Sequence, residues 1–184
     1  MYIDIYIGCN FNKVTIGGRA MEDEILQIEK SINCLNSIGG FLSSGDEYKA
    51  NTMSITWGSV GYMWKKKIFS VVISDIRYTK EFIDKGNTFT ISIPYGRSFD
   101  KAIDLCGHNS GRDVNKEELT GIKFISGKVV ESPVIDGCNM YYECKVILKQ
   151  KVDVNSVNPE LNLDEEENGY TMYFGEIVAQ YLRE

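Results

Sequence analysis

Strand-like segments follow one another along this chain with only short helical stretches between them, and this spacing restricts the fold more than any other feature. Residues 87–94 alternate apolar Phe89, Ile91 and Ile93 with hydroxyl side chains, which is the period of a half-buried strand. Long helices do not alternate regularly with the strands, which argues against a doubly wound parallel sheet. We expect a mainly β fold, a closed or nearly closed β-barrel, with further strands at residues 41–44, 51–57, 68–74, 122–130, 138–152 and 169–182.

Short helices are expected to cover this barrel. The longest is predicted over residues 21–36, where isoleucine and leucine side chains recur at helical spacing. A second is predicted to begin with Thr79 as its N-cap and to end at Gly86, and a third spans residues 99–105. Residues 154–168 are polar and acidic, which predicts a solvated loop between two strands.

Length and charge restrict the domain count and the partners. The 184 residues, 43% of them hydrophobic, suit one domain over residues 1–184, in which residues 1–20 are an N-terminal arm or a strand pair. The net charge of -6 argues against nucleic acid, because binding to its phosphates needs clustered cations. No apolar run approaches the roughly 20 residues that span a bilayer, and no basic and apolar leader is present, so no membrane partner is expected.

The cysteines and histidine argue against a metal site and a disulfide framework. The five cysteines are an odd set without a CxxC pair, which fits a reduced, cytoplasmic protein, and Cys106 is expected to be a buried thiol. His108 is the single histidine, so a multi-histidine metal site is excluded and a hydrolase triad has no support. We expect His108 in a loop and no bound metal.

Three separated segments combine hydroxyl groups, amides, cations and one large aromatic ring. A phosphate is bound by backbone N–H groups, hydroxyls and a cation, and Arg77 beside Thr79 at the start of a helix supplies all three. Together the segments have the chemistry that a flat ring with a phosphate tail requires, and they lie at residues 51–58, 77–79 and 106–113.

Each segment also has an ordinary structural explanation. Thr79 beside Arg77 is equally a capping threonine beside a surface arginine. The polar turn at residues 110–113 is equally a loop from which Asp113 or Asn115 begins a helix. Trp57 either forms the wall of a ring-sized pocket or fills the core.

Taken in order, the three segments resemble the flavin reductase-like family of FMN-binding split-barrel proteins, the group that includes flavoredoxin. The resemblance runs from about Glu24 to Val152, with a weaker similarity at the C-terminus. It implies a split β-barrel with short covering helices, usually a homodimer with noncovalent FMN near the dimer interface. Its motifs are Asn-Thr-Met-Ser and Trp-Gly at 51–58, Arg-Tyr-Thr at 77–79, Cys-Gly at 106–107, and Ser-Gly-Arg-Asp at 110–113 with Lys116 beyond.

The resemblance implies a division of roles within the site. Residues 51–54 would line the flavin, Trp57 would lie close to the ring system, and residues 77–79 would hold the ribityl phosphate. No catalytic side chain is implied, because the flavin itself carries the redox chemistry. The cofactor-binding residues expected on this basis are Asn51, Thr52, Met53, Ser54, Trp57, Arg77, Tyr78, Thr79, Cys106, Ser110, Gly111 and Lys116.

The leading hypothesis is an FMN-dependent oxidoreductase that accepts hydride from NADH or NADPH, or electrons from a redox partner protein. The alternative is a flavoredoxin-like electron carrier, or a flavin-binding module without NAD(P)H turnover of its own. FAD or haem in place of FMN, and a barrel that has lost its cofactor, stay open. The histidine often found just before the family's closing strand is missing before residues 170–178, so its contribution is not expected here.

Overall fold

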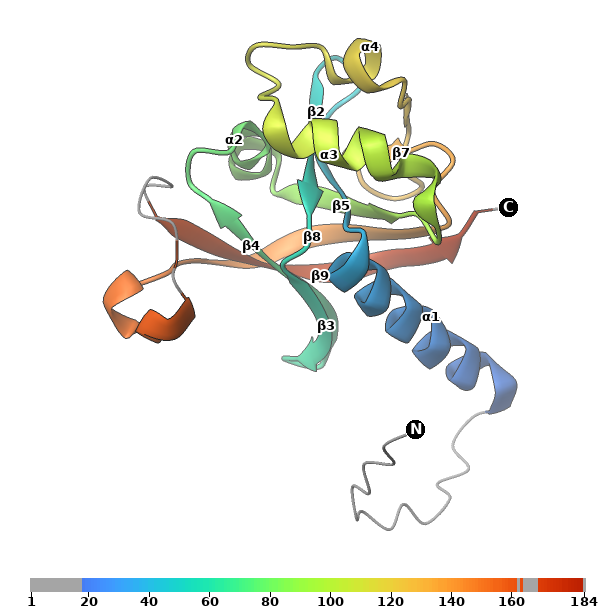
Figure 1. The fold of residues 1–184 in the computed structure, drawn as a ribbon. Helices are drawn as coiled ribbons and strands as arrows, with labels where there is room; N and C mark the ends of the chain where they lie inside the picture. Colours follow the sequence, from blue (N-terminus) through green and yellow to red (C-terminus); the bar gives the residue numbers. More distant parts are fainter. Residues whose placement is uncertain (1–17, 162, 164–168, 184) are drawn as a thin grey trace, which may run out of the picture.

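The computed structural model describes residues 18–161, 163 and 169–183. Figure 1 shows a curled sheet with α2, α3 and α4 gathered over one end and α1 extending from the other. The arm or strand pair expected for residues 1–20 lies mostly outside the described residues, and residues 18–20 open the first helix. The helices are α1 (Gly18–Ser37), α2 (Tyr78–Gly86), α3 (Asp100–His108) and α4 (Lys116–Thr120), and the strands are β1 (Gly40–Gly45), β2 (Ala50–Ile55), β3 (Gly58–Met63), β4 (Lys66–Ser74), β5 (Thr88–Ile93), β6 (Phe124–Ile125), β7 (Val134–Ile135), β8 (Met140–Lys151) and β9 (Tyr170–Leu182).

The two edges of the main sheet are joined by a very short connection. Its strands run in the order β2-β1-β5-β8-β9-β4-β3, so β2 and β3 are opposite edges, yet only Thr56 and Trp57 separate them along the chain. Three peptide units reach at most about 11 Å, so the sheet must curl until its edges nearly meet. The Trp57 carbonyl accepts a hydrogen bond of 3.3 Å from the Val72 amide of β4. We call the gap between β2 and the β3–β4 hairpin the seam.

Strand β5 is buried on both of its faces. Its apolar side chains join the core inside the barrel, as the alternating pattern predicts. The hydroxyl side chains of Thr90 and Ser92 are also buried, because a second apolar cluster that includes residues of α3 and β7 covers that face. Thr90 donates to the Pro133 carbonyl, and Ser92 accepts from the Ile135 amide at 3.0 Å. The hydroxyls therefore pin the β7 segment to the sheet rather than facing water.

Most of the predicted helices and strands are present. The helix expected over residues 21–36 is α1, and those expected at 79–86 and 99–105 are α2 and α3 with slightly different ends. Of the two proposed starts for a later helix, Asn115 is correct, since its side chain accepts from the amides of Glu117 and Glu118 at the start of α4.

The strand predicted over residues 122–130 is wrong apart from β6. The rest of that segment is held by Glu143, a fully buried residue of β8 whose carboxylate accepts from the amides of Lys128, Val129 and Val130 at 2.6–2.8 Å and from the Tyr181 hydroxyl at 2.7 Å. Burial opposes the charge, but these hydrogen bonds outweigh it and hold the pKa of the carboxyl below its usual value. We call these groups the Glu143 anchor.

Strand β3 is absent from the sequence predictions for a physical reason. It is an edge strand that is mostly exposed, so its sequence has no apolar face to reveal it. Its turn into β4 has positive φ at Trp64 (50°) and Lys65 (62°), positions at which asparagine and glycine are the usual signal. In the described part of the chain, no helix is long and apolar enough to cross a bilayer.

Candidate functional site

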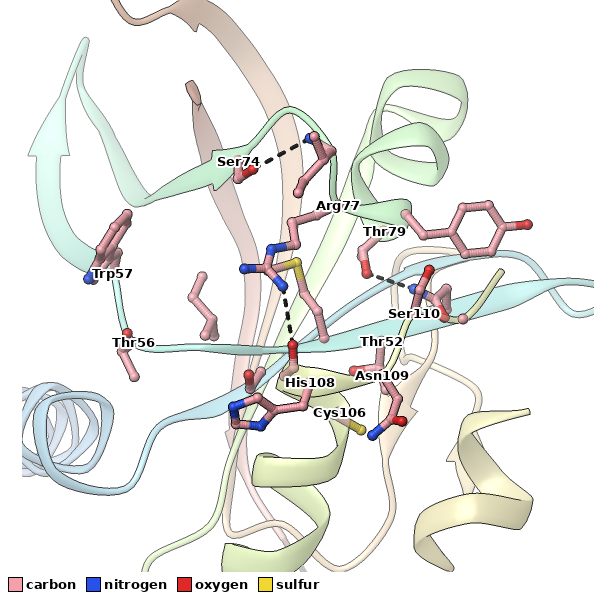
Figure 2. Close-up of a pocket in the computed structure, with 18 of the residues that line it drawn as sticks. Thr52, Thr56, Trp57, Ser74, Arg77, Thr79, Cys106, His108, Asn109 and Ser110 are labelled. Atoms are coloured by element: carbon pink, nitrogen blue, oxygen red, sulfur yellow. Dashed lines mark hydrogen bonds between the residues drawn. The ribbon is translucent and has the colours of Figure 1, made fainter. Parts of the chain in front are cut away.

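A cavity of about 740 Å³ opens along the seam. Its walls come from β2 and the Thr56–Trp57 connection, from the end of β4 and the start of α2, and from the C-terminal half of α3 with the turn that follows it. All twelve residues expected to bind the cofactor line this cavity. Figure 2 shows Trp57 at one end, Thr79 and Ser110 at the other, and the Arg77 side chain between them.

The end of the cavity near α2 is built by close contact between β2 and the turn after α3. The Asn51 amide donates to the Thr79 hydroxyl at 2.8 Å, which ties β2 to the first turn of α2. Gly111 lies so close that an added Cβ would be 1.9 Å from the Asn51 Oδ1 and 3.2 Å from the Tyr78 ring. A larger residue at 111 would therefore push apart the two walls that meet here.

Two arginines bring positive charge to the cavity, Arg77 between its ends and Arg112 near α2. The Arg77 guanidinium donates to the Gly107 carbonyl at 3.1 Å. Arg112 donates to the Ile76 carbonyl at 3.0 Å, pairs with Glu81, and lies 4.8 Å from the centre of the Tyr78 ring. The N-terminus of α2 also faces this space, and the first turn of a helix carries partial positive charge. An anionic group is the ligand that this end favours.

A buried lysine closes the cavity on the α3 side. Lys116 is 5% exposed, and its ammonium donates to the carbonyls of Cys106, at 2.7 Å, and Asn109. Burial lowers the pKa of Lys116, Cys106 opposes that shift, and Arg77 adds to it. Burial also raises the pKa of the Cys106 thiol, so Cys106 is the buried, protonated group that the sequence predicts. The ammonium thus fixes the turn after α3 from within.

The opposite end of the cavity is aromatic and aliphatic. Trp57 packs against Tyr170 of β9 with ring centres 5.8 Å apart, and it remains 53% exposed. Leu161 and Leu163, from the connection between β8 and β9, line the same cavity. Trp57 is therefore a wall residue rather than a core residue. The segment predicted as a solvated loop contributes apolar side chains to the site as well as turns at its surface.

Two sequence predictions about single residues need correction. Thr79 is not the N-cap of α2: Arg77 occupies that position without a side-chain cap, and the Thr79 hydroxyl instead accepts from Asn51. His108 is not in a loop, because it is the last residue of α3, where its ring nitrogen bonds to the Asp104 carbonyl at 2.9 Å. Both residues still line the cavity.

The cavity also has walls that the sequence does not single out. Residues such as leucine and tyrosine carry no signal of ligand contact, and only the curling of the sheet brings β9 against the β2–β3 connection. Arg112 lies inside the Ser-Gly-Arg-Asp motif at 110–113. Its positive charge is the signal that could have marked it as a residue of the site. Beyond the twelve, the lining residues inside the three segments are Ile55, Thr56, Gly107, His108, Asn109, Arg112 and Asp113. Those outside them are Val72, Ser74, Ile76, Leu161, Leu163 and Tyr170.

Comparison with known proteins agrees with this architecture. The family described as the flavin reductase like domain matches residues 41–184. The chain belongs to that family. A 28% identical relative, an uncharacterised protein of Archaeoglobus fulgidus, matches over 99 residues, 54% of this flavin reductase-like chain and 55% of that protein. The match therefore spans about half the length of that curated relative.

Solved structures share the fold of this flavin reductase-like chain. Flavoredoxin of Desulfovibrio vulgaris is 22% identical with a TM-score of 0.63 over 79% of this chain and 69% of that one. Flavoredoxin from Methanosarcina acetivorans is 25% identical with a TM-score of 0.62 over 79% and 68%. An NADH:FAD oxidoreductase of Streptomyces globisporus is 12% identical with a TM-score of 0.60 over 79% and 76%. The expected split-barrel class is confirmed: one further neighbour is described as a putative flavin reductase with a split barrel domain, and another as an FMN-binding domain of a flavin reductase-like enzyme.

Proposed function

We propose that this protein is an FMN-binding oxidoreductase that takes hydride from NADH or NADPH, or electrons from a redox partner protein, and passes them to an acceptor. Family membership supports flavin chemistry in general. The finer assignment depends on one observation: three segments far apart in sequence converge on a single cavity, with Trp57 at one end, Thr79 and Ser110 at the other and Arg77 between them.

The residues present fit an amphipathic ring with an anionic tail. The close approach of Gly111 to Asn51 and Tyr78 lets the turn after α3 lie directly against β2 beside the start of α2. Arg77, Tyr78 and Thr79 bind the phosphate with Ser110, while Lys116 holds the turn that presents them. Residues 51–54 and Cys106 line the ribityl chain and the ring edge.

The ring lies toward Trp57 in this proposal, where Tyr170 supports the indole from behind. Bound FMN would supply both hydride and one-electron transfer, so the protein needs no acid, base or nucleophile of its own. The described residues bind and orient the ring and exclude water from one of its faces. The half-exposed Trp57 leaves an approach from solvent for a donor or an acceptor.

A flavoredoxin-like carrier without NAD(P)H turnover is the alternative. It is supported by the missing histidine before β9, by the absence of a recognisable nicotinamide motif in the sequence, and by flavoredoxins among the structural neighbours. Rapid bleaching of the bound flavin by NADH or NADPH in a stopped-flow experiment supports the reductase. A flavin that is reduced by dithionite but by neither nucleotide supports the carrier.

The working form in this proposal is a cytoplasmic homodimer. Exposed apolar side chains on α1, on the β3–β4 hairpin and at the seam, among them Ile25, Tyr62 and Trp64, offer a face for a second copy. The cysteines in the described part of the chain are free, which suits a reducing compartment. Light scattering after size exclusion tests the dimer, and a monomer at micromolar concentration contradicts it.

Purification followed by an absorbance spectrum tests the proposed function. A yellow protein that releases FMN on denaturation, identified by mass spectrometry, is the expected result. If the protein is colourless, added FMN should restore the flavin spectrum. A colourless protein that does not bind added FMN contradicts the proposal.

A further inference from the structure

His108 is the single histidine of the sequence, and it lies in the wall of the cavity along the seam. Its side chain is 78% exposed, so it stands at the mouth of the cavity rather than in its depth. Figure 2 shows it below Arg77, on the side of the cavity toward Thr56. The imidazole can therefore reach both a molecule in the cavity and the water outside it.

The last turn of α3 holds the backbone of His108 in place. The Arg77 guanidinium donates to the Gly107 carbonyl at 3.1 Å, and the buried Lys116 ammonium donates to the Asn109 carbonyl. The carbonyls on both sides of His108 are thus bound by cations of the cavity wall. A side chain on this backbone has a defined place, which is what a catalytic group requires.

The same turn lies close to the strand that lines the flavin in the proposed function. A Cβ added to Gly107 would be 2.6 Å from the Ser54 hydroxyl of β2, so a larger residue would displace that hydroxyl or push α3 away. Ser54 and His108 both line the cavity. The close approach of α3 to β2 therefore brings the imidazole toward the proposed position of the flavin.

Asp104 orients the imidazole from within α3. The Nδ1 nitrogen of His108 lies 2.9 Å from the Asp104 carbonyl oxygen and 3.2 Å from its carboxylate. Because these oxygens accept hydrogen bonds, Nδ1 carries a proton and Nε2 is the nitrogen left to exchange one. His108 is also the last residue of α3, where a helix favours a cationic side chain. The imidazole is thus set up to gain a proton and to give it up at Nε2.

The mouth of the cavity is apolar at its Trp57 end. Trp57 and Leu161 line the cavity and are 53% and 66% exposed. Exposed apolar and aromatic side chains around a cavity favour a ligand with a flat apolar surface. An imidazolium at the same mouth adds a proton donor, which a carbonyl oxygen needs as it gains electrons.

We infer that His108 is a catalytic acid for a flat carbonyl acceptor of the quinone class. This rests on the proposed function, in which the nicotinamide nucleotide or the redox partner supplies the electrons. Electron transfer through a flavin needs no side-chain acid, and His108 acts on the acceptor instead.

The proton and the electrons reach the acceptor from different sides. The quinone gains a hydride, which carries both electrons, from the reduced flavin, and the flavin returns to its oxidised form. The quinone also gains a proton from Nε2 of His108, so its two carbonyl oxygens become hydroxyls. The neutral imidazole then takes a proton from water at the exposed mouth. The charged groups around the imidazole are Asp104 on α3, Arg77 at the start of α2 and Lys116 on α4.

Nuclear magnetic resonance of the untagged, flavin-free protein tests the position of His108 without turnover. The chain has one histidine, so its ring gives one pair of proton signals. Adding FMN should shift both signals, because an aromatic ring would then lie beside them. Lys101→Gln, on the exposed side of α3 and outside the cavity, is the control and should show the same shift.

Oxidation of the reduced, FMN-loaded protein in a stopped-flow experiment tests the chemistry. Menadione is a quinone that takes a proton with its electrons, whereas ferricyanide takes an electron alone. In His108→Gln the ratio of the menadione rate to the ferricyanide rate should fall about 100-fold, a usual contribution of a general acid. Lys101→Gln should keep the parent ratio.

The pH dependence of the same ratio gives a second measurement. In the parent protein the ratio should fall as the pH rises through the range in which imidazole loses its proton. His108→Gln should remove this dependence, because glutamine has no proton to lose in that range. A fall that persists in His108→Gln would show that another group delivers the proton.

The outcomes separate this inference from the proposed function. If FMN binds but the imidazole signals do not move, His108 does not lie beside the flavin, so the inference is wrong and the proposed function stands. If His108→Gln leaves the ratio of the two rates unchanged, the imidazole is not the proton donor. If the protein binds no flavin, both proposals are wrong.

Discussion

The Glu143 anchor and the seam cavity both concentrate charge inside the fold, and they use it in opposite ways. At the anchor, one carboxylate meets three amides and a phenol, so its charge is satisfied by the protein itself. At the seam, Arg77 and Lys116 donate to backbone carbonyls beside a large open space. The difference teaches that charge inside a fold can be used up by the protein itself, as in the first region, or can remain beside open space, where we propose that a flavin binds.

The largest effect should come from removing the anchor charge. Glu143→Ala leaves three amides buried without their acceptor, which should lower the free energy of unfolding by about 3 kcal/mol or more. Urea denaturation measures this loss, and Glu29→Ala on the exposed face of α1 is the control. Flavin affinity of the folded fraction should not change. If Glu143→Ala has normal stability but binds flavin more weakly, the Glu143 anchor serves the ligand rather than the fold.

A methyl group at position 111 should act on the ligand rather than on the fold. In Gly111→Ala the new Cβ displaces Asn51 or the 110–112 turn, and flavin affinity should fall about 100-fold, or about 2.7 kcal/mol. Gly61→Ala is the matched control, because an added Cβ there meets nothing within 4 Å. Fluorescence titration measures the affinity, and thermal unfolding checks that stability changes little. Unchanged affinity in Gly111→Ala would show that the ligand does not approach this turn.

Loss of one cation at the seam should have a smaller effect. Arg77→Ala removes a charged donor at the proposed phosphate end, so FMN should bind about tenfold more weakly, with less effect on riboflavin, which lacks the phosphate. Arg97→Ala, at an exposed ion pair with Asp100, is the control. If Arg77→Ala binds FMN as tightly as the parent protein, this guanidinium does not hold the phosphate.

The smallest effect concerns a carboxylate that belongs to neither region. Asp84 meets Lys80, Lys149 and Tyr173; burial opposes its charge, but these hydrogen bonds outweigh it and lower the pKa to about 2 from 3.8. A carboxylate whose pKa is lowered on folding stabilises the fold at every pH above its usual pKa. That contribution to stability disappears as the pH falls from about 4 to about 2.

The Asp84 side chain is 30% exposed, so dissolved salt screens its charge. Its contribution to the free energy of unfolding should therefore not exceed about 1 kcal/mol. Unfolding curves across that pH range measure it. Asp84→Asn should flatten this part of the profile, whereas an unaltered acid profile in Asp84→Asn would show that the other carboxylates account for it.

The sequence predicts the parts of the fold whose signal is local. Strand β5 and helix α1 each show one apolar face at the right period, and both are confirmed. Residues 122–130 look like a strand because Val129 and Val130 are apolar and β-branched. Their conformation is decided by a distant glutamate on β8, and no local pattern reveals such a tertiary contact.

The candidate site likewise has residues that the sequence reveals and residues that it does not. The motif residues of the three segments are recognisable in the sequence, and the structure brings all twelve to one cavity. Tyr170 and Leu161 carry no such signal, since they become wall residues only because β9 and its preceding connection lie beside the seam. Thr79 shows a further limit. A threonine at a helix start is usually a cap, but here its hydroxyl accepts a hydrogen bond from Asn51 of β2.

The two-residue connection between β2 and β3 has a consequence for how such a chain can change in evolution or design. Thr56 and Trp57 limit how far apart the adjoining ends of β2 and β3 can lie, and the cavity lies along that separation. The length of this loop therefore limits the width of the proposed binding cleft. An inserted residue beside Trp57 would widen the cleft for a bulkier ligand while every binding side chain kept its identity, so a change of substrate size need not begin with a point mutation.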